Sequence, residues 1–370
     1  MNEQPGEFKG VTIVGTGLMG GSFGLAVERF YPDKIVAGVD FQEEIKGALR
    51  RDAIDEGYNP EDLKSAVSGA DLVVLATPID RIMEILGRLP ELMESETVVL
   101  DLGSTKKDIC SCGREAFEGG PVTFIGGHPM TGAEVKGIAG AHPLLYENST
   151  FVLVTPGGEP TEISEKLEDF LLGLGADPRY MAAETHDRIV ARVSHLPQLI
   201  SISLMETVGE ADHPGDYLGL AGGGFRDMTR IAESPFEIWE DILDTNGELI
   251  REEVENFLRN TEETLSCIER GGIGQKFEEA GELRGELPRS SKGISSSTFK
   301  VAVMIPDRPG ALAEMTSSLA EEGINIRDLE LQKVREDYGG TFQVYFDSLE
   351  AAREAKEILL NHGFESRVMD

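Results

Sequence analysis

Short apolar runs rich in β-branched residues alternate with helix-length segments through the first half of the chain. The runs lie at 11–15, 35–40, 71–77, 97–103, 122–127 and 150–156. Strands that are covered on both faces are almost continuously hydrophobic, and helix-length connections join parallel neighbours. The pattern therefore predicts a doubly wound α/β domain with a parallel sheet (Rossmann-type) over residues 1–160.

The pattern changes near residue 160, where strand signals become rare. One more helix and a short strand are expected, and residues 184–280 then carry apolar residues at helical spacing, interrupted by Pro197. This favours an all-helical domain over 161–280 that covers the substrate and forms a homodimer. Residues 281–297 are rich in Gly, Ser and charge and are expected to be a linker.

The tail, residues 298–370, alternates apolar strand runs with two amphipathic helices. The expected order of elements is β-α-β-β-α-β, which is the order of a ferredoxin-like α+β domain.

Charge and cysteine content narrow the class of protein. The 67 acidic residues outnumber the 34 basic residues, giving a formal charge of −33, which argues against nucleic-acid or anionic-membrane partners. A saline habitat and an ordinary acidic protein both remain open as reasons for this charge. The cysteines are expected to be reduced thiols with no metal site, and the absence of an apolar span or signal segment favours a soluble, cytoplasmic protein.

A glycine-punctuated turn follows the first predicted strand and opens an apolar helix. Gly15, Gly17 and Gly20 have the spacing G-x-G-x-x-G, with Leu18 and Met19 between the last two. The first glycine permits a tight turn, the second lets the backbone approach a pyrophosphate, and the third lets helix and strand pack closely. The helix N-terminus adds N–H groups and a positive dipole end. The turn is therefore expected to bind a dinucleotide.

Asp40 closes the second predicted strand. A carboxylate at that point accepts hydrogen bonds from ribose hydroxyls and repels a 2′-phosphate, which favours NAD over NADP. The alternative is that Asp40 caps the next helix. Thr77 and Pro78, at the end of the third predicted strand, are assigned to the same cofactor site.

Four motifs follow the glycine turn in a fixed order: DLGSTK (101–106), GGHPMTGAE (126–134), VSHLP (193–197) and GGFRDMTRIAESPFEIWEDI (223–242). Together they resemble the prephenate dehydrogenase family over about residues 10–280. The tail is similar to an ACT domain, a regulatory attachment that is common in that family.

The resemblance implies oxidative decarboxylation of prephenate. A hydride leaves the carbinol carbon for NAD, the ring carboxylate departs as carbon dioxide, and the products are 4-hydroxyphenylpyruvate and NADH. Three alternative functions remain open. They are an arogenate dehydrogenase, whose substrate has an amino group in place of the keto group, a β-hydroxyacid dehydrogenase, and a non-catalytic amino-acid sensor.

His128 and Ser104 are the candidate catalytic residues. His128 is expected in a glycine-rich loop, where a neutral imidazole can accept the hydroxyl proton because its pKa lies near working pH. By resemblance it is the catalytic hydrogen-bond acceptor, and Ser104 binds the same hydroxyl and orients it. Ser104 is alternatively a helix N-cap. Lys106 and Lys107 are expected to be solvated charges of the following helix.

By resemblance, His195 contacts the pyruvyl side chain of the substrate. At 100° per residue, Arg188 and Arg192 share its helix face and His186 lies opposite, so His186 is interpreted as a structural histidine.

By resemblance, Arg230 holds the ring carboxylate, for which a guanidinium is suited because it binds carboxylates bidentately. A surface ion pair is the alternative, and nearby Arg226 is a second candidate. Glu134 matches the family and is expected to pair with Arg230 as a gate. Where relatives carry a small hydroxyl residue this chain has Ala133, so a hydrogen bond to the substrate side chain is expected either to be lost or to be supplied by Thr131.

A candidate effector site lies where the first strand of the tail meets its first helix, whose N–H groups can hold an amino-acid carboxylate. The assigned residues are Asp307, Pro309, Gly310, Ala311, Leu312 and Asn325. Tyrosine is the expected effector, and a purely structural dimerisation domain is the alternative.

Overall fold

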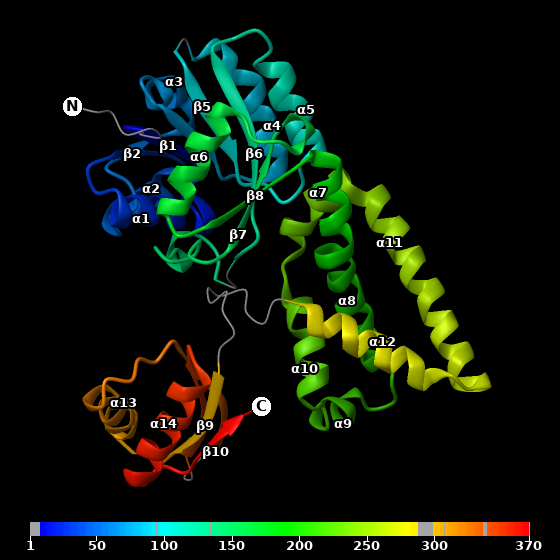
Figure 1. Ribbon diagram of the computed structural model, residues 1–370. Coiled ribbons are helices and arrows are strands. Elements are labelled where there is room, and N and C mark those ends of the chain that lie inside the picture. The colour runs from blue at the N-terminus through cyan, green and yellow to red at the C-terminus, as the bar shows by residue number, and fades with distance from the viewer. Residues whose placement is uncertain are drawn as a thin grey trace. The chain divides into compact units, whose positions relative to one another are not determined.

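The computed structural model describes residues 8–93, 95–132, 135–287, 299–306, 308–335 and 339–369. The chain divides into two compact units, residues 1–291 and 292–370 (Figure 1). None of the helices in these described ranges has the length and apolar character needed to cross a bilayer.

The first unit is built on an eight-stranded sheet with the order β3-β2-β1-β4-β5-β6-β7-β8. The strands are β1 (Gly10–Val14), β2 (Ile35–Val39), β3 (Glu56–Tyr58), β4 (Leu72–Leu75), β5 (Thr97–Asp101), β6 (Val122–Pro129), β7 (Thr150–Val154) and β8 (Asp177–Met181). All six strands predicted in the first half are confirmed. The apolar pattern does not predict β3, because its three residues are exposed or half-buried and contain no apolar run.

The expectation of a wholly parallel sheet is wrong at one position, since β6 and β7 pair antiparallel. Parallel neighbours need a crossover, usually a helix. Between β6 and β7 the described chain instead forms an irregular loop whose one helical element is the short turn η3 (Ile138–Gly140). The sheet also ends at Met181, later than the expected boundary at 160, because β8 pairs parallel with β7.

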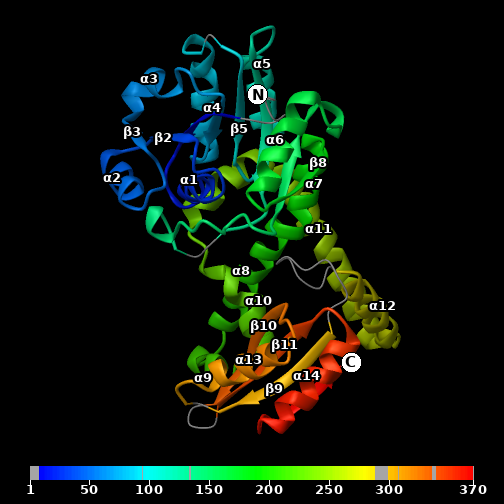
Figure 2. The ribbon, with the colours of Figure 1, turned by 60° about the vertical axis from the view of Figure 1, so that its left-hand side comes forward.

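Helices cover both faces of this sheet (Figures 1 and 2). They are α1 (Leu18–Phe30), α2 (Gln42–Arg50), α3 (Leu63–Val67), α4 (Ile79–Arg88), α5 (Lys107–Ala116) and α6 (Glu162–Gly173). One core joins the sheet to α1 and α6 through Phe23 and Phe170. The second core contains Ile82 of α4 and Ile250 of the long helix α11 (Phe236–Arg270). The helical region therefore shares a core with the sheet.

The helical region begins with α7 (Ala183–Val190), a π-helical turn η5 (Ala191–His195) and α8 (Leu196–Gly209). Pro197 is the second residue of α8, which comes directly after the π-helical turn. The remaining elements are α9 (Pro214–Gly219), α10 (Gly223–Thr229), η6 (Arg230–Glu233), α11 and α12 (Ile273–Glu286). The linker expected from 281 is wrong up to Glu286, which is helical, and residues 288–297 lie outside the described residues.

The second unit has an antiparallel sheet with the order β10-β11-β9-β12. Its elements are β9 (Phe299–Ile305), α13 (Ala311–Glu321), β10 (Asp328–Arg335), β11 (Gly339–Phe346), α14 (Leu349–Asn361) and β12 (Ser366–Met369). This is the expected ferredoxin-like order. Its core is separate and includes Val303, Met315 and Phe346.

Candidate active site

The glycine turn lies between β1 and α1, as the spacing predicts. Gly15 has φ +94°, a conformation that side-chain-bearing residues rarely adopt, and Gly17 is the N-cap of α1. A Cβ on Gly20 would overlap the carbonyl oxygen of Gly15, so only glycine lets α1 approach β1 this closely. Among the described residues, a Cβ on Gly17 would meet only Gly137 within 4 Å, at 3.9 Å. These features leave the room that a pyrophosphate needs at the first turn of α1, where Leu18 and Met19 lie.

Asp40 follows β2 and faces the same turn. Its Oδ2 accepts hydrogen bonds from the backbone N of Thr16 at 2.7 Å and from Thr16 Oγ1 at 3.2 Å. The capping alternative is not seen, because α2 has Phe41 as its N-cap and no side-chain cap. A carboxylate fixed beside the glycine turn fits the ribose hydroxyls of a dinucleotide.

Thr77 and Pro78 lie at the end of β4, the neighbour of β1 on its other side. A Cβ on Gly15 would come within 2.9 Å of Thr77 Cγ2, so the turn after β1 is in contact with the connection after β4. The strand order reverses between β1 and β4, and ligands of open α/β sheets bind at that switch point. All of the predicted cofactor residues therefore lie together.

His128 belongs to β6 and pairs with Val152 of β7, so the expectation that it lies in a loop is wrong. Its ring is partly buried, and its Nδ1 lies 2.8 Å from Nε2 of His186. His186 Nδ1 in turn lies 2.7 Å from Oδ1 of Asp187. Both residues are on α7 and are fully buried.

Lys106 is buried, which corrects the expectation that it is a solvated charge. Its ammonium pairs with the carboxylate of Asp101, and it donates a hydrogen bond to the carbonyl oxygen of Gly127 at 2.8 Å. A Cβ on Gly127 would overlap the backbone of Asp101. The lysine and the glycine together fix the backbone next to His128. Lys107 is exposed, as expected.

The imidazoles in this region are held neutral. Burial lowers the pKa of His128 well below its ordinary value, and the nearby His186 and Lys106 lower it further. Burial also lowers the pKa of His186, against the opposing effect of Asp187. A neutral imidazole can accept a proton or a hydrogen bond, which a charged one cannot.

His195 is buried in the turn η5, next to α11. Its Nδ1 lies 3.3 Å from Asn246 Nδ2, and its ring meets Trp239 edge to face at 5.7 Å. Burial lowers the pKa of His195 to about 4. Asn246 Nδ2 also donates to the carbonyl oxygen of Asp187 at 3.0 Å, so Asn246 links His195 to the hydrogen-bonded chain that ends at His128.

The helix faces predicted around His195 are wrong. Arg188 and Arg192 point outward and pair with Glu252 and Glu253 of α11, while His186 lies on the buried side with His195. The cause is the π-helical turn, which adds a residue and rotates the following positions.

Ser104 is partly buried in the connection from β5 to α5. It does not cap α5, whose N-cap is Lys106. Thr131 is partly buried just after β6, and Arg230 is exposed at the start of η6. Glu134 and Ala133 lie outside the described residues.

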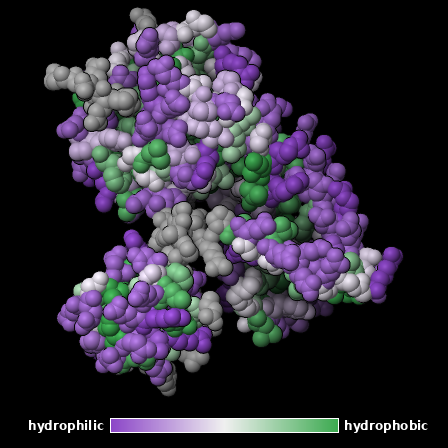
Figure 3. All heavy atoms as spheres, viewed as in Figure 1, coloured by the Kyte–Doolittle hydropathy of each residue, from purple (hydrophilic) through white to green (hydrophobic). Residues whose placement is uncertain are grey.

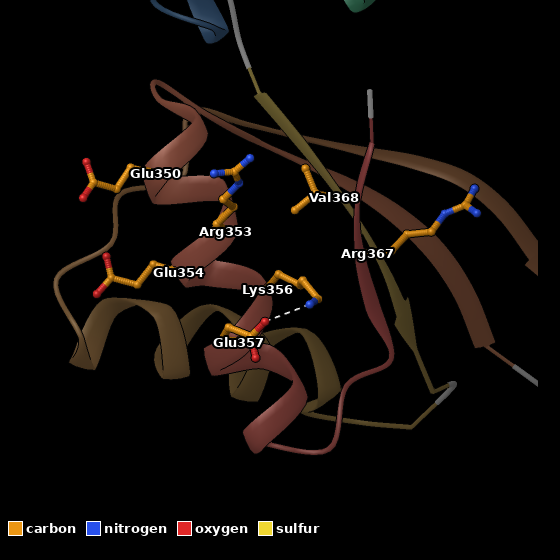
Figure 4. Close-up of a pocket in the computed structure, with 7 residues that line it drawn as sticks. All are labelled: Glu350, Arg353, Glu354, Lys356, Glu357, Arg367 and Val368. Carbon is orange, nitrogen blue, oxygen red and sulfur yellow. Dashed lines mark hydrogen bonds and ion pairs between the residues drawn. The ribbon is translucent and has the colours of Figure 1, made fainter.

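In the second unit, Gly310 has φ +86° and is the N-cap of α13, with Ala311 and Leu312 in the first turn. Pro309 precedes that turn, Asn325 is exposed in the connection to β10, and Asp307 lies outside the described residues. A separate open hollow of about 700 Å³ lies between α14 and β12 (Figure 4). Its lining of charged side chains, such as Arg353 and Arg367, includes none of the predicted effector residues.

The sequence reading missed His186, Asp187, Lys106, Asp101 and Asn246. The available signals were the adjacent His186-Asp187 pair on a helix near VSHLP, and the acid and lysine within DLGSTK.

A glycine turn at the switch point and a neutral histidine beside the carboxyl edge of the same sheet define the class as a dinucleotide-dependent dehydrogenase. Two family models agree: "prephenate dehydrogenase, nucleotide-binding domain" matches residues 23–179, and "prephenate dehydrogenase, dimerization domain" matches residues 182–280. The chain belongs to the prephenate dehydrogenase family of NAD-dependent oxidoreductases.

Two prephenate dehydrogenases align over nearly the whole chain. That of Bacillus subtilis (strain 168) is 31% identical over 94% of this chain and 95% of its own length. That of Lactococcus lactis subsp. cremoris (strain MG1363) is 32% identical over 95% of this chain and 97% of its own.

Solved structures match about three quarters of the chain. Prephenate dehydrogenase from A. aeolicus, in complex with hydroxyphenyl propionate and NAD+, is 28% identical with a TM-score of 0.70, covering 76% of this chain and 99% of the other. Arogenate dehydrogenase from Synechocystis is 25% identical with a TM-score of 0.66, covering 75% of this chain and 100% of the other.

Proposed function

We propose that this chain converts prephenate and NAD+ to 4-hydroxyphenylpyruvate, carbon dioxide and NADH. The observation that carries the proposal is the position of His128, a neutral imidazole beside the carboxyl edge of the sheet that carries the glycine turn. The bound dinucleotide supplies the hydride acceptor. The protein must then bind the substrate dianion, orient its hydroxyl and control one proton.

His128 accepts a hydrogen bond from the ring hydroxyl and takes up positive charge as the carbinol carbon is oxidised. The ring carboxylate leaves as carbon dioxide, its bonding electrons complete the aromatic ring, and His128 returns the proton to the phenolic oxygen of the product. Ser104 binds the same hydroxyl from the connection after β5. The charges balance without net proton release.

The substrate has two carboxylates, and separate residues hold them. His195 contacts the pyruvyl side chain from η5, and Arg230 binds the ring carboxylate through its guanidinium. Thr131 supplies a further hydrogen bond to the side chain, and the gate expected between Glu134 and Arg230 involves a residue outside the described ones.

Arogenate is the second candidate substrate. The arogenate dehydrogenase of Synechocystis matches this fold over three quarters of the chain. The two substrates differ at one group, a keto oxygen against an ammonium. A neutral His195 adds no positive charge near that group, so its pKa of about 4 does not distinguish the two.

We further propose that residues 299–369 form an ACT-type regulatory domain, which binds tyrosine at the turn Pro309–Leu312. Its support is the ferredoxin-like order of elements and the alignment of the Bacillus and Lactococcus enzymes over this tail. A structural dimerisation domain is the alternative.

The active form is a homodimer through the helical region. Apolar side chains gather at α9, where Tyr217, Leu218 and Leu220 are exposed (Figure 3). Large exposed apolar patches mark protein interfaces. The expected cytoplasmic location remains a prediction.

The deciding experiment measures NADH or NADPH formation with each pairing of prephenate or arogenate with NAD+ or NADP+. The proposal expects the largest kcat/KM with prephenate and NAD+. A larger kcat/KM with arogenate would make arogenate the substrate in place of prephenate. No turnover of either compound would overturn the proposed function. Repeating the best pairing with added tyrosine tests the effector.

A further inference from the structure

The hydrogen-bond chain from Asp187 through His186 to His128 fixes where each proton lies. It begins at Asp187, whose two carboxylate oxygens accept hydrogen bonds from the backbone N of Lys106 at 2.7 Å and of Lys107 at 2.8 Å. Burial alone would raise the pKa of Asp187, but the hydrogen bonds from His186 and from these backbone groups lower it. Asp187 is therefore a carboxylate, which can only accept hydrogen bonds.

The tautomer of His186 follows from that carboxylate. Its Nδ1, at 2.7 Å from Asp187, must carry a proton and donate it. A neutral imidazole has a single N–H, so the Nε2 of His186 holds a lone pair and accepts. The group facing it at 2.8 Å is Nδ1 of His128, which must therefore be the donor. The remaining nitrogen of His128, Nε2, is left with its lone pair.

We propose that His186 and Asp187 are positioning residues that hold His128 in its Nδ1-protonated tautomer, so that Nε2 accepts the substrate hydroxyl. This inference rests on the proposed oxidation of a hydroxyl group. It requires the chain to stay neutral. The titratable groups that face it are Lys106 from the start of α5, Asp101 from β5 and His195 from η5. Lys106 opposes protonation of both imidazoles, and Asp101 pairs with Lys106.

His195 has the opposite tautomer, which provides an internal reference. The Nδ2 of Asn246 donates to the carbonyl oxygen of Asp187 at 3.0 Å and lies 3.3 Å from Nδ1 of His195. An amide nitrogen donates only, so Nδ1 of His195 accepts and its Nε2 carries the proton. One site thus presents an imidazole acceptor at His128 and an imidazole donor at His195.

The test begins with the tautomers of the full-length wild-type enzyme. The protein contains six histidines, so selective ¹⁵N-histidine labelling gives few enough signals, which single His→Asn variants assign. Nitrogen shifts distinguish protonated from unprotonated ring nitrogens. We expect Nδ1–H at His128 and Nε2–H at His195 near neutral pH. A His128 that is protonated at Nε2, or is charged, would overturn the inference without reference to activity.

Two variants of similar size then test the link to turnover. The Oε1 of H186Q can still accept from His128 Nδ1–H, whereas H186L offers no acceptor. We expect H186L to lose about 10²-fold or more in kcat, with little change in the KM for prephenate, and its His128 signals to change tautomer. H186Q should retain the wild-type tautomer and most of the kcat.

Equal kcat in H186L and wild type, or H186Q as impaired as H186L with an unchanged tautomer, would overturn the positioning role. NADH-binding affinity and circular dichroism establish that both variants fold. Failure of the proposed function has another signature, because the wild type would then turn over neither prephenate nor arogenate while its tautomers remain as assigned.

Discussion

Lys106 and Asp101 form an ion pair in which both side chains have 0% solvent exposure. The pair joins the end of β5 to the start of α5, and Lys106 also reaches Gly127, the residue before His128. Asp101 accepts hydrogen bonds from the backbone N of Gly103 at 2.8 Å and of Gly127 at 3.1 Å. The charges therefore hold the backbone that carries the candidate catalytic histidine.

Lys106→Met should destabilise the protein strongly. Removing one partner leaves the buried carboxylate uncompensated, which costs about 3–5 kcal/mol in the free energy of unfolding. Urea unfolding followed by circular dichroism measures this. Lys107→Met is the matched control, since Lys107 is exposed, and should change stability by less than about 0.5 kcal/mol. The double variant Asp101→Asn/Lys106→Met should recover part of the loss. A Lys106→Met variant as stable as wild type would contradict the buried pair.

His128→Asn should lower kcat by about 10²–10⁴-fold, because asparagine cannot act as a proton acceptor. NADH binding should survive, since the glycine turn and Asp40 are untouched. Steady-state rates and a fluorescence titration with NADH measure the two effects. His362→Asn, at an exposed position of the second unit, is the control and should keep wild-type rates. Near-normal turnover of His128→Asn would remove His128 from the mechanism.

Stability should fall as the pH drops below about 6.5. Burial lowers the pKa of His128, His186 and His195 in the folded protein, that of His195 to about 4, whereas the unfolded histidines titrate near 6.5. In that window the unfolded chain binds more protons, so protonation favours unfolding. His195, whose pKa in the folded protein is about 4, then costs about 1 kcal/mol between pH 6.5 and pH 5.5, and the lowered pKa values of His128 and His186 act in the same direction.

Urea midpoints measured from about pH 7.5 to about pH 5.5 test this pH dependence. His195→Asn removes one of the three groups and should have a shallower dependence than wild type. A stability that rises toward acid pH would show that these histidines are not buried as neutral groups.

The sheet strands and the cofactor turn were predictable because they follow from local rules. Each of the six strands predicted in the first half is a short apolar run, and the glycine spacing has a fixed geometric meaning at Gly15 and Gly20. The antiparallel pairing of β6 and β7 was not predictable, because the connecting loop carries no pattern that fixes its direction.

The environment of His128 depends on tertiary packing. A lysine at the start of a helix usually faces water. Lys106 does not, because the assembled sheet encloses its side chain between Asp101 and Gly127. His186 was placed on the wrong helix face because regular helical spacing fails across the π-helical turn at Ala191–His195.

Asp40→Asn should raise the use of NADP relative to NAD by about tenfold, or about 1.4 kcal/mol. The charge that repels a 2′-phosphate is lost, while the amide oxygen can still accept from the backbone N of Thr16 at the turn. The ratio of kcat/KM for the two cofactors measures this. Asp71→Asn is the control: Asp71 also accepts from backbone N–H groups, but at the start of β1, and should leave the ratio unchanged. An unchanged ratio in Asp40→Asn would place cofactor discrimination elsewhere.

Deleting residues 290–370 should leave catalysis and remove the response to tyrosine. The second unit has its own core, and the solved prephenate dehydrogenase from A. aeolicus matches only 76% of this chain while being covered over 99% of its length. Both family models that match the chain, at residues 23–179 and 182–280, also lie within the first unit. Turnover with and without tyrosine is compared between the full chain and a chain ending at residue 289. Tyrosine that still inhibits the shortened chain must act at the active site, and a shortened chain that folds but has no turnover would show that the tail is structural.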